Sequence, residues 1–269
     1  MLWSLPKPPE GQNFWAMNNI TSRKNDMLKR VRKLNTDRDY RAGQGEFVCE
    51  GIKAFEQAIA CGAQVTAVFI QQEIYERLAQ NLVNIDTYVL DKQLVEYISS
   101  VQTCQGIVFT CKTTVNRPNI RPGGKYIILD GINDPGNLGT MIRTASAFDI
   151  GQIILVNNCA DVYNPKTVRS TMGAVFNHNC CLMEVLEVEK HFCGQGINIY
   201  GAALVEQACD IREISFENCA AVIGSEAQGI SPEIQRLCGK FFIIPINPNT
   251  QSLNAAVAGG IVMWEMGKQ

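Results

Sequence analysis

Polar residues follow three short apolar runs in the second half of the chain, and each run leads into a segment that can form a helix. These residues are Asn137 and Arg143 after the run 127–129, Glu226 after 220–223, and Ser252 and Asn254 after 241–246. Their amide, hydroxyl, carboxylate and guanidinium groups can bind and orient a polar ligand. Turn and cap chemistry explains Asn137, Ser252 and Asn254 singly, but not their joint occurrence. The pattern therefore favours a ligand site.

The elements that must position these residues are three strand–loop–helix units, each with a Gly- or Asn-rich loop. Three such units predict an α/β fold with a parallel sheet, in which ligands bind at the carboxyl ends of the strands. The last helix is expected to begin after an N-cap at Ser252. It is rich in small residues, namely Ala255, Ala256, Ala258, Gly259 and Gly260. A ligand, another strand or a partner subunit must therefore approach it closely.

In their order and spacing, the three segments resemble the SpoU class (TrmH-like) of RNA ribose 2′-O-methyltransferases, within the SPOUT superfamily. The resemblance covers roughly the whole C-terminal half, and a weaker match extends over the N-terminal half. It implies an enzyme that transfers a methyl group from S-adenosylmethionine to a ribose 2′-hydroxyl of RNA. It also implies a deep trefoil knot in the C-terminal domain, which physical priors alone would not predict.

The resemblance assigns roles to particular side chains. The catalytic side comprises Arg143, Asn137, Glu226, Ser252 and Asn254, and the cofactor side comprises Gly224, Ile244 and Leu253, with Leu204 as a further wall. In the family's usual proposal, the arginine activates the 2′-hydroxyl. Because guanidinium holds its proton firmly, Arg143 can instead stay cationic, bind the adjacent phosphate and favour the developing alkoxide. Glu226 can pair with Arg143 by either route.

Composition argues against several other classes of protein. No apolar run approaches the roughly 18–20 residues of a membrane span. Eleven cysteines occur without a C-x-x-C pair, and with only two histidines, so we expect no metal site. Buried free thiols in a reducing cytoplasm are the simpler interpretation. The chain lacks G-x-G-x-x-G after a strand and a G-x-S-x-G elbow, so an oxidoreductase and a hydrolase are weak alternatives.

Basic residues concentrate near the start of the chain although its net charge is −2. Between 21 and 41 three aspartates oppose eight cations, namely Arg23, Lys24, Lys29, Arg30, Arg32, Lys33, Arg38 and Arg41. Such a patch suits contact with a phosphate backbone, and a solvated helix face is an equal alternative. We take Arg23, Lys24 and Arg41 as RNA-binding candidates, although a salt-bridged role for Arg41 is equally compatible. Lys166 and Arg169 join them because 163–176 resembles a short family helix that carries Lys and Arg.

The chain divides into four parts by composition and resemblance. Residues 1–18 are expected to be a disordered tail or an upstream extension. Residues 19–112 alternate helices and strands and resemble a small L30e-like substrate-binding domain. The polar stretch 113–125 contains two prolines and two glycines and is the predicted linker. Residues 126–269 form the expected methyltransferase domain.

The resemblance also guides the substrate and the assembly. The L30e-like unit favours ribosomal RNA, most plausibly of the large subunit, over transfer RNA. A catalytically silent RNA-binding ribosome-assembly factor is the other alternative, and the retention of all five polar positions argues against it. We expect a cytoplasmic homodimer that forms through the C-terminal domain and binds no membrane. RNA would then bridge one subunit's N-terminal domain and the partner's catalytic cleft.

Overall fold

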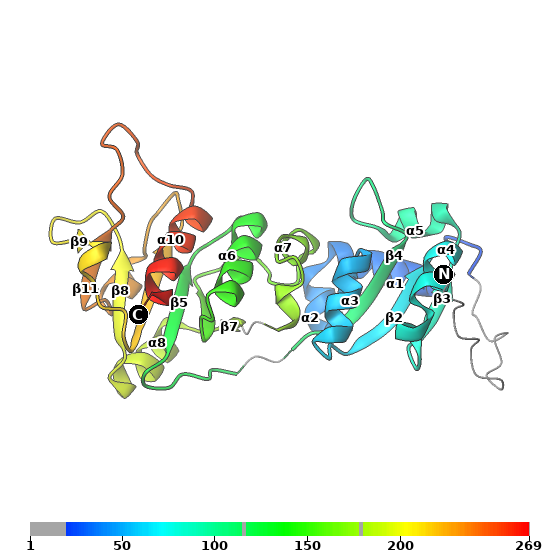
Figure 1. The fold of residues 1–269 in the computed structure, drawn as a ribbon, viewed down its shortest axis with the longest axis horizontal. Helices are drawn as coiled ribbons and strands as arrows, with labels where there is room; N and C mark the ends of the chain where they lie inside the picture. Colours follow the sequence, from blue (N-terminus) through cyan, green and yellow to red (C-terminus); the bar gives the residue numbers. More distant parts are fainter. Residues whose placement is uncertain (1–19, 115–116, 178–179, 269) are drawn as a thin grey trace, which may run out of the picture.

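The computed structural model describes residues 20–114, 117–177 and 180–268. The tail predicted at 1–18 lies outside these residues. Two β-sheets lie one after the other along the long axis of the molecule, each with helices packed against it (Figure 1). The last helix, α10, covers one face of the second sheet beside α6, far from the N-terminal unit.

The N-terminal unit is a four-stranded sheet in the order β1-β4-β2-β3. Strand β4 runs antiparallel to β1 and β2, and β2 runs parallel to β3. The alternation of helices and strands predicted within 19–112 is confirmed from α3 to β4, whereas α2 and β1 were not predicted. The elements are α1 Asp26–Thr36, α2 Arg38–Gln44, β1 Glu46–Glu50, α3 Ile52–Ala60, β2 Val65–Ile70, α4 Gln72–Leu78, η1 Ala79–Leu82, β3 Thr87–Val89, α5 Lys92–Ile98 and β4 Ile107–Lys112.

The C-terminal unit is a seven-stranded sheet in the order β7-β6-β5-β10-β8-β11-β9, and every pairing in it is parallel. The predicted parallel sheet is therefore confirmed. Its elements are β5 Lys125–Asp130, α6 Pro135–Ala147, β6 Gln152–Val156, α7 Pro165–Ser170, η2 Ala174–Phe176, β7 Cys180–Leu182, α8 Val185–Phe192, η3 Cys193–Gln195, β8 Asn198–Ala202, β9 Cys209–Asp210, η4 Ile211–Glu213, β10 Cys219–Gly224, α9 Pro232–Gln235, β11 Lys240–Ile243 and α10 Ala255–Gly267.

Both faces of the second sheet are buried, and its central strands are accordingly apolar through most of their length. Successive side chains of a strand point to opposite faces. Ile127 and Leu129 of β5 accordingly enter the core under α6 and α10, while Tyr126 and Ile128 enter the core that packs against α8. All eleven cysteines are free thiols, and only Cys193 is exposed, which agrees with their expected role as small buried residues.

Helix α10 approaches α6 closely, and this contact explains the glycine at position 259. A Cβ placed on Gly259 would lie 2.9 Å from the sulfur of Met141 in α6. One on Gly260 would contact the methyl group of Thr144, also in α6. The close approach predicted for this helix is therefore made, on this side, by another helix of the same chain.

The two units share a packed junction. The segment 162–176 follows β6 in sequence, yet its apolar side chains join the core of the N-terminal sheet. Val168 and Val175 are buried there, and the ring of Tyr163 lies 4.6 Å from that of Phe47 between centroids. The predicted linker at 113–125 thus joins two units that also hold each other through side-chain packing.

No helix among the described residues combines the length and the apolar character needed to cross a membrane.

Glu46 binds two cations inside the N-terminal unit. Its side chain is 6% exposed, accepts a hydrogen bond from Lys112 Nζ at 2.8 Å and contacts the guanidinium of Arg30. Burial raises the pKa of Glu46, but the bonds from Lys112 and Arg30 outweigh it, so its pKa lies below the ordinary value. The carboxylate therefore stabilises the fold above its unfolded-state pKa, and this contribution is lost as the pH falls through its folded-state pKa.

We expect Glu46→Gln to lower the free energy of unfolding near neutral pH by about 1–3 kcal/mol, because a charged hydrogen-bond acceptor is removed from a buried site. Urea unfolding over a pH series should show that, between about pH 5 and pH 3, the variant loses less unfolding free energy than the wild type does. The exposed Glu96→Gln is the control and should change stability by less than about 0.5 kcal/mol. Parallel pH profiles for Glu46→Gln and wild type would contradict the expectation.

Candidate active site

Four parallel strands bring the predicted site residues to one edge of the second sheet. Strands β5, β10, β8 and β11 are successive neighbours, and all run in the same direction. The segments that follow their carboxyl ends therefore emerge side by side. These segments carry Asn137 after β5, Gly224 and Glu226 at the end of β10, Leu204 after β8, and Ile244 after β11.

The three polar motifs meet at the carboxylate of Glu226. Asn137 Nδ2 donates to Glu226 Oε1 at 2.7 Å, and the backbone N–H of Ala255 donates to the same oxygen at 3.1 Å. Asn254 Nδ2 donates to Asn137 Oδ1 at 3.0 Å and lies 3.4 Å from Glu226 Oε1. Residues separated by 117 positions in the chain thus form one hydrogen-bonded network.

Asn254 is also the N-cap of α10. Its Oδ1 accepts from the backbone N–H groups of Ala256 and Val257 at 3.0 and 3.3 Å. The predicted N-cap at Ser252 is therefore wrong by two residues, since a cap must directly precede the first helical residue. Ser252 is exposed and makes no hydrogen bond within the described part of the chain.

The start of α6 is fixed by Asp134, which the sequence reasoning missed. Its side chain accepts from the N–H of Asn137 at 2.9 Å and caps a helix whose first residue is Pro135. The Asp-Pro pair was the available signal, because proline is favoured directly after an N-cap. Lys166 Nζ lies 2.8 Å from the second carboxylate oxygen. This ammonium, together with the Asn137 N–H, holds the pKa of Asp134 below its ordinary value.

Arg143 lies apart from this network. It is exposed in the middle of α6 and forms no ion pair or hydrogen bond with any described residue. Six residues separate it from Asn137, which corresponds to about 120° around a helix, so the two side chains leave different faces. Glu226 binds amide groups instead of the guanidinium. The predicted Glu226–Arg143 pair is therefore not formed within one chain.

The cofactor candidates surround a crowded backbone turn at the same edge. A Cβ on Gly224 would lie 2.2 Å from the carbonyl carbon of Gly229, so this position admits only glycine. Ile244 and Leu253 are half-buried, and Leu204 is 78% exposed. Aliphatic side chains that are partly or largely exposed at the carboxyl ends of parallel strands suit a ligand with a flat base and a polar tail. These residues thus fit the cofactor implied by the resemblance.

Arg41 holds the junction between the two units. It is 4% exposed, and its Nε and Nη2 donate to Asp161 Oδ2 at 3.0 and 2.7 Å. Its Nη1 donates to the Leu34 carbonyl at 2.7 Å. The RNA contact predicted for Arg41 is therefore corrected in favour of the salt-bridged alternative. A buried guanidinium requires such partners, because an unpaired buried charge is costly.

The other four RNA-binding candidates remain at the surface or near it. Arg23 and Lys24 are exposed, whereas Lys166 pairs with Asp134 and is more than half exposed. Arg169 Nη1 donates to Glu50 Oε1 at 3.2 Å and also contacts the Ser100 hydroxyl. Within the described residues, no group of three Cys, His, Asp or Glu side chains could hold a metal ion.

The fold and site together define an α/β protein whose parallel sheet carries a composite ligand site at its carboxyl edge. The chain belongs to the SpoU rRNA Methylase family, whose pattern matches residues 124–264. Residues 25–108 match the MRM3-like substrate binding domain.

Individual relatives match nearly the whole chain. The 23S rRNA (guanosine(2553)-2′-O)-methyltransferase RlmP of Bacillus subtilis is 28% identical, over 93% of this chain and 99% of its own length. The uncharacterized tRNA/rRNA methyltransferase slr1673 of Synechocystis is 32% identical and covers 93% of both chains. The AdoMet-bound rRNA methyltransferase from Sinorhizobium meliloti has a solved structure that is 27% identical, with a TM-score of 0.85, over 94% of this chain and 98% of its own.

We expect Gly224→Ala to destabilise the protein by about 1–3 kcal/mol, because the added methyl group must push the neighbouring backbone aside. The matched control is Gly239→Ala, since a Cβ at Gly239 meets nothing within 4 Å. Urea unfolding of the two variants provides the comparison. Equal stability of both variants would show that the turn after β10 is not packed as described.

Proposed function

We propose that this chain is an S-adenosylmethionine-dependent methyltransferase that methylates a ribose 2′-hydroxyl of ribosomal RNA, with large-subunit RNA favoured. The observation that carries the proposal is the network of Asn137, Glu226 and Asn254 at the carboxyl edge of the sheet, in a chain of the SpoU rRNA Methylase family. The name of the Bacillus subtilis relative supports both the 2′-O position and the large-subunit RNA.

The cofactor side of the site comprises Gly224, Ile244, Leu253 and Leu204. Bound S-adenosylmethionine would supply an electrophilic methyl group on its sulfonium sulfur. Gly224 allows the tight turn that brings the Gly229 backbone against the end of β10, and the three aliphatic side chains cover the apolar parts of the cofactor. Ile244 is anchored because it packs against the core beneath the sheet. Burial of Leu204, now 78% exposed, would accompany binding.

The amide network orients the ribose that accepts the methyl group. Glu226 accepts three N–H groups, so its carboxylate fixes Asn137 and Asn254 rather than acting as a free base. The side-chain nitrogen of Asn137 has two hydrogens and donates one of them to Glu226, which leaves the other free to bond a ribose oxygen. Orientation of this kind supplies much of the rate of a transfer between two bound groups.

Arg143 acts as a cation in this proposal. Its exposed guanidinium binds the phosphate beside the target ribose and stabilises the oxygen as it loses its proton. Ser252, on the exposed segment before α10, faces the same RNA. Arg143 and Asn137 leave α6 in different directions, so in this proposal the partner subunit completes the site.

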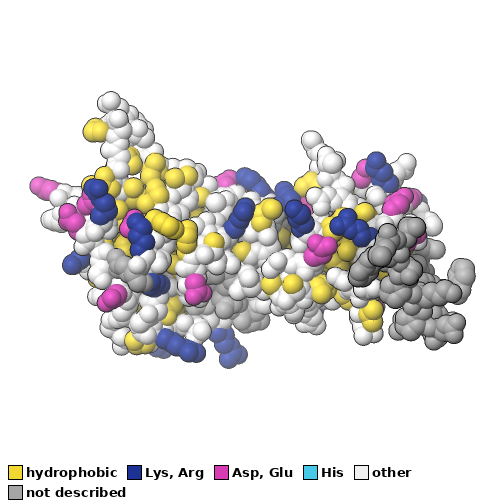
Figure 2. Space-filling model, viewed as in Figure 1, with side chains coloured by type: hydrophobic (Ala, Val, Ile, Leu, Met, Phe, Trp, Pro, Cys, Tyr) yellow, Lys and Arg dark blue, Asp and Glu magenta, His cyan; other side chains and the backbone are white. Residues whose placement is uncertain are grey.

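The surface of α10 supports a homodimer through the C-terminal unit. Val257 and Trp264 are each 52% exposed, and Ile261 is partly exposed between them along the helix. Figure 2 shows hydrophobic side chains gathered over the region of α10 and α6. A helix that is apolar all round is normally buried on both sides. RNA bridging one N-terminal unit and the partner's cleft is part of this proposal.

The domain assignments and the knot belong to the same proposal. Residues 19–112 form the L30e-like substrate-binding domain, 113–125 the linker, and 126–269 the methyltransferase domain. The last segment passes through a loop of the chain in a trefoil knot. Contact between Ala255 and Glu226 supports this path, since it brings the start of α10 against the loop that follows β10. The protein acts in the cytoplasm.

The wild-type protein should transfer labelled methyl groups from S-adenosylmethionine to ribosomal RNA prepared from cells that lack the gene. Digestion should release a 2′-O-methyl nucleoside. A methylated base alone would refute the ribose assignment, and label in transfer RNA only would refute the ribosomal one. No transfer to either RNA pool would favour a silent RNA-binding factor.

Arg143→Ala and Asn137→Ala should each lower kcat/KM by about 100-fold or more, because each removes a group that stabilises or orients the reacting oxygen. Arg236→Ala is the charge-matched control, since Arg236 is 73% exposed and makes only a 3.9 Å contact with Glu233. If the control loses as much activity as Arg143→Ala, the loss reflects surface charge rather than a role in the site.

Trp264→Glu should convert the dimer to a monomer at micromolar concentrations, because it places a charge in the apolar contact surface of α10. Sedimentation equilibrium measures the change, and Glu265→Gln, on the next residue, serves as the control. A monomeric wild-type protein, or a dimeric Trp264→Glu variant, would exclude this interface.

A further inference from the structure

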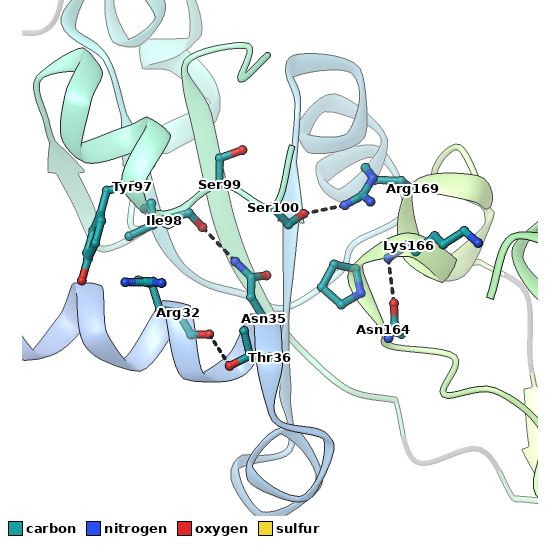
Figure 3. A pocket seen from close by; sticks show the side chains of 11 residues that line it. Arg32, Asn35, Thr36, Tyr97, Ile98, Ser99, Ser100, Asn164, Lys166 and Arg169 are labelled. Atoms are coloured by element: carbon teal, nitrogen blue, oxygen red, sulfur yellow. Dashed lines mark hydrogen bonds between the residues drawn. The ribbon is translucent and has the colours of Figure 1, made fainter. Parts of the chain in front are cut away.

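A pocket lies at the junction of the two units, outside the edge where the polar motifs meet. Its volume is about 370 Å³, and α1, α5 and α7 contribute its walls (Figure 3). The side chains that matter below are Arg32, Asn35, Tyr97, Ser100, Lys166 and Arg169. The volume falls in the usual range of small-molecule sites, about 300–1,000 Å³. The pocket is thus large enough for one nucleotide.

Every charged side chain that lines this junction pocket is a cation. Arg32 comes from the N-terminal unit, and Lys166 and Arg169 come from α7. Their anionic partners, Glu50 and Asp134, do not line the pocket. Figure 2 shows Lys and Arg side chains gathered over this middle part of the molecule. Three cations against these two carboxylates leave a net positive local charge, which favours an anionic ligand although the whole chain has a net charge of −2.

One wall is a flat stack. The guanidinium carbon of Arg32 lies 4.4 Å from the ring centroid of Tyr97, and that of Arg23 lies 5.1 Å from it. Single-stranded nucleic acids are commonly bound by such surfaces, because bases stack on aromatic rings and on guanidinium planes. This wall suits a base, whereas a simple phosphate binder would not need it.

The wall also contains an unpaired acceptor. Asn35 Nδ2 donates to the Ile98 carbonyl at 2.8 Å, which fixes the orientation of its amide. Its Oδ1 is buried, and no hydrogen-bond donor in the described structure reaches it. A buried acceptor without a partner costs free energy. A hydroxyl or amino group of a ligand would offset that cost, and RNA carries both.

The junction pocket connects directly to the methyl-transfer edge. Lys166 lines the pocket, and its ammonium binds Asp134, which caps α6 through the N–H of Asn137. Asn137 in turn donates to Glu226. The pocket and the acceptor site of one subunit are therefore separated by only a few side chains, so RNA that enters this cleft from the partner's N-terminal unit can also reach the pocket.

We propose that the junction pocket binds a nucleotide that neighbours the methylated one on the same RNA strand. Lys166 and Arg169 bind its phosphate, and its base stacks on the Tyr97–Arg32 wall. This assignment rests on the proposed RNA substrate. RNA is favoured over an acidic protein segment because the stacking wall and the continuity with Asn137 both fit a polynucleotide.

The test measures binding of a fluorescent oligouridylate of about 12 nucleotides to the full-length protein by anisotropy over a salt series. Arg32→Gln should weaken binding about three- to tenfold and lower the salt slope by up to about 0.7, because a stacking surface is lost together with one cation beside the single strand. Tyr97→Leu should weaken binding about tenfold with an unchanged slope, because stacking is lost but charge is not. Thermal unfolding confirms that each variant is folded.

Lys33→Gln is the matched control. Lys33 follows Arg32 on α1 and carries the same charge, but it contacts Tyr40 and does not line the pocket. It should change binding less than about twofold. Equal losses for Arg32→Gln and Lys33→Gln would overturn the proposal, because the affinity would then reside in the general charge of α1. Unchanged binding by Tyr97→Leu would also overturn it.

Two further outcomes separate this proposal from the proposed function. Binding is measured without S-adenosylmethionine, so its result does not depend on methyl transfer. If the protein methylates RNA but the wild type and Arg32→Gln bind oligouridylate equally well, the pocket proposal is refuted and the proposed function is kept. A protein that never transfers methyl groups, yet shows the predicted losses, would refute the function and keep the pocket. Displacement of the RNA by oligoglutamate at equal charge would assign the pocket to an acidic protein.

Discussion

The carboxylate of Glu226 is the point at which three segments, distant in sequence, are tied together. It accepts N–H groups from Asn137 and Asn254 and from the backbone of Ala255. An ionised acceptor forms stronger hydrogen bonds than a neutral one, so a single side chain can hold three loops. The network is possible only because β5 and β10 run parallel as neighbours and release their loops at one edge. Strand direction and one carboxylate together create the site.

The junction imposes a second constraint. The segment 162–176 follows β6, but its apolar residues are part of the N-terminal core, and Arg41 binds Asp161 across the boundary. Helix α7 is therefore held by both units. Its position places Lys166 between the N-terminal surface and the cap of α6. An RNA-binding unit and a catalytic unit joined only by a flexible linker could not maintain this relation.

The exposed elements indicate what one chain leaves incomplete. Arg143 has no partner among the described residues, and α10 presents Val257 and Trp264 to solvent. Leu204 and the segment before Asn254 are likewise uncovered. In the proposed function, the cation contacts RNA, the apolar helix face contacts a second subunit, and the open loops contact the cofactor. The rigid core supplies the geometry, and the uncovered parts are where binding would add order.

The sequence by itself determined most of the elements and the residue types of the site. Apolar runs followed by Gly- and Asn-rich loops specify strand–loop–helix units locally, so the parallel sheet and the grouping of Asn137, Glu226 and Asn254 could be predicted. The tertiary structure alone decided that Asn254 caps α10, that Glu226 binds amides instead of Arg143, and that Arg41 is buried against Asp161. Asp134 could have been found from its Asp-Pro pair. The others could not, because the partner of a polar side chain depends on which distant residue packing brings within about 3 Å of it.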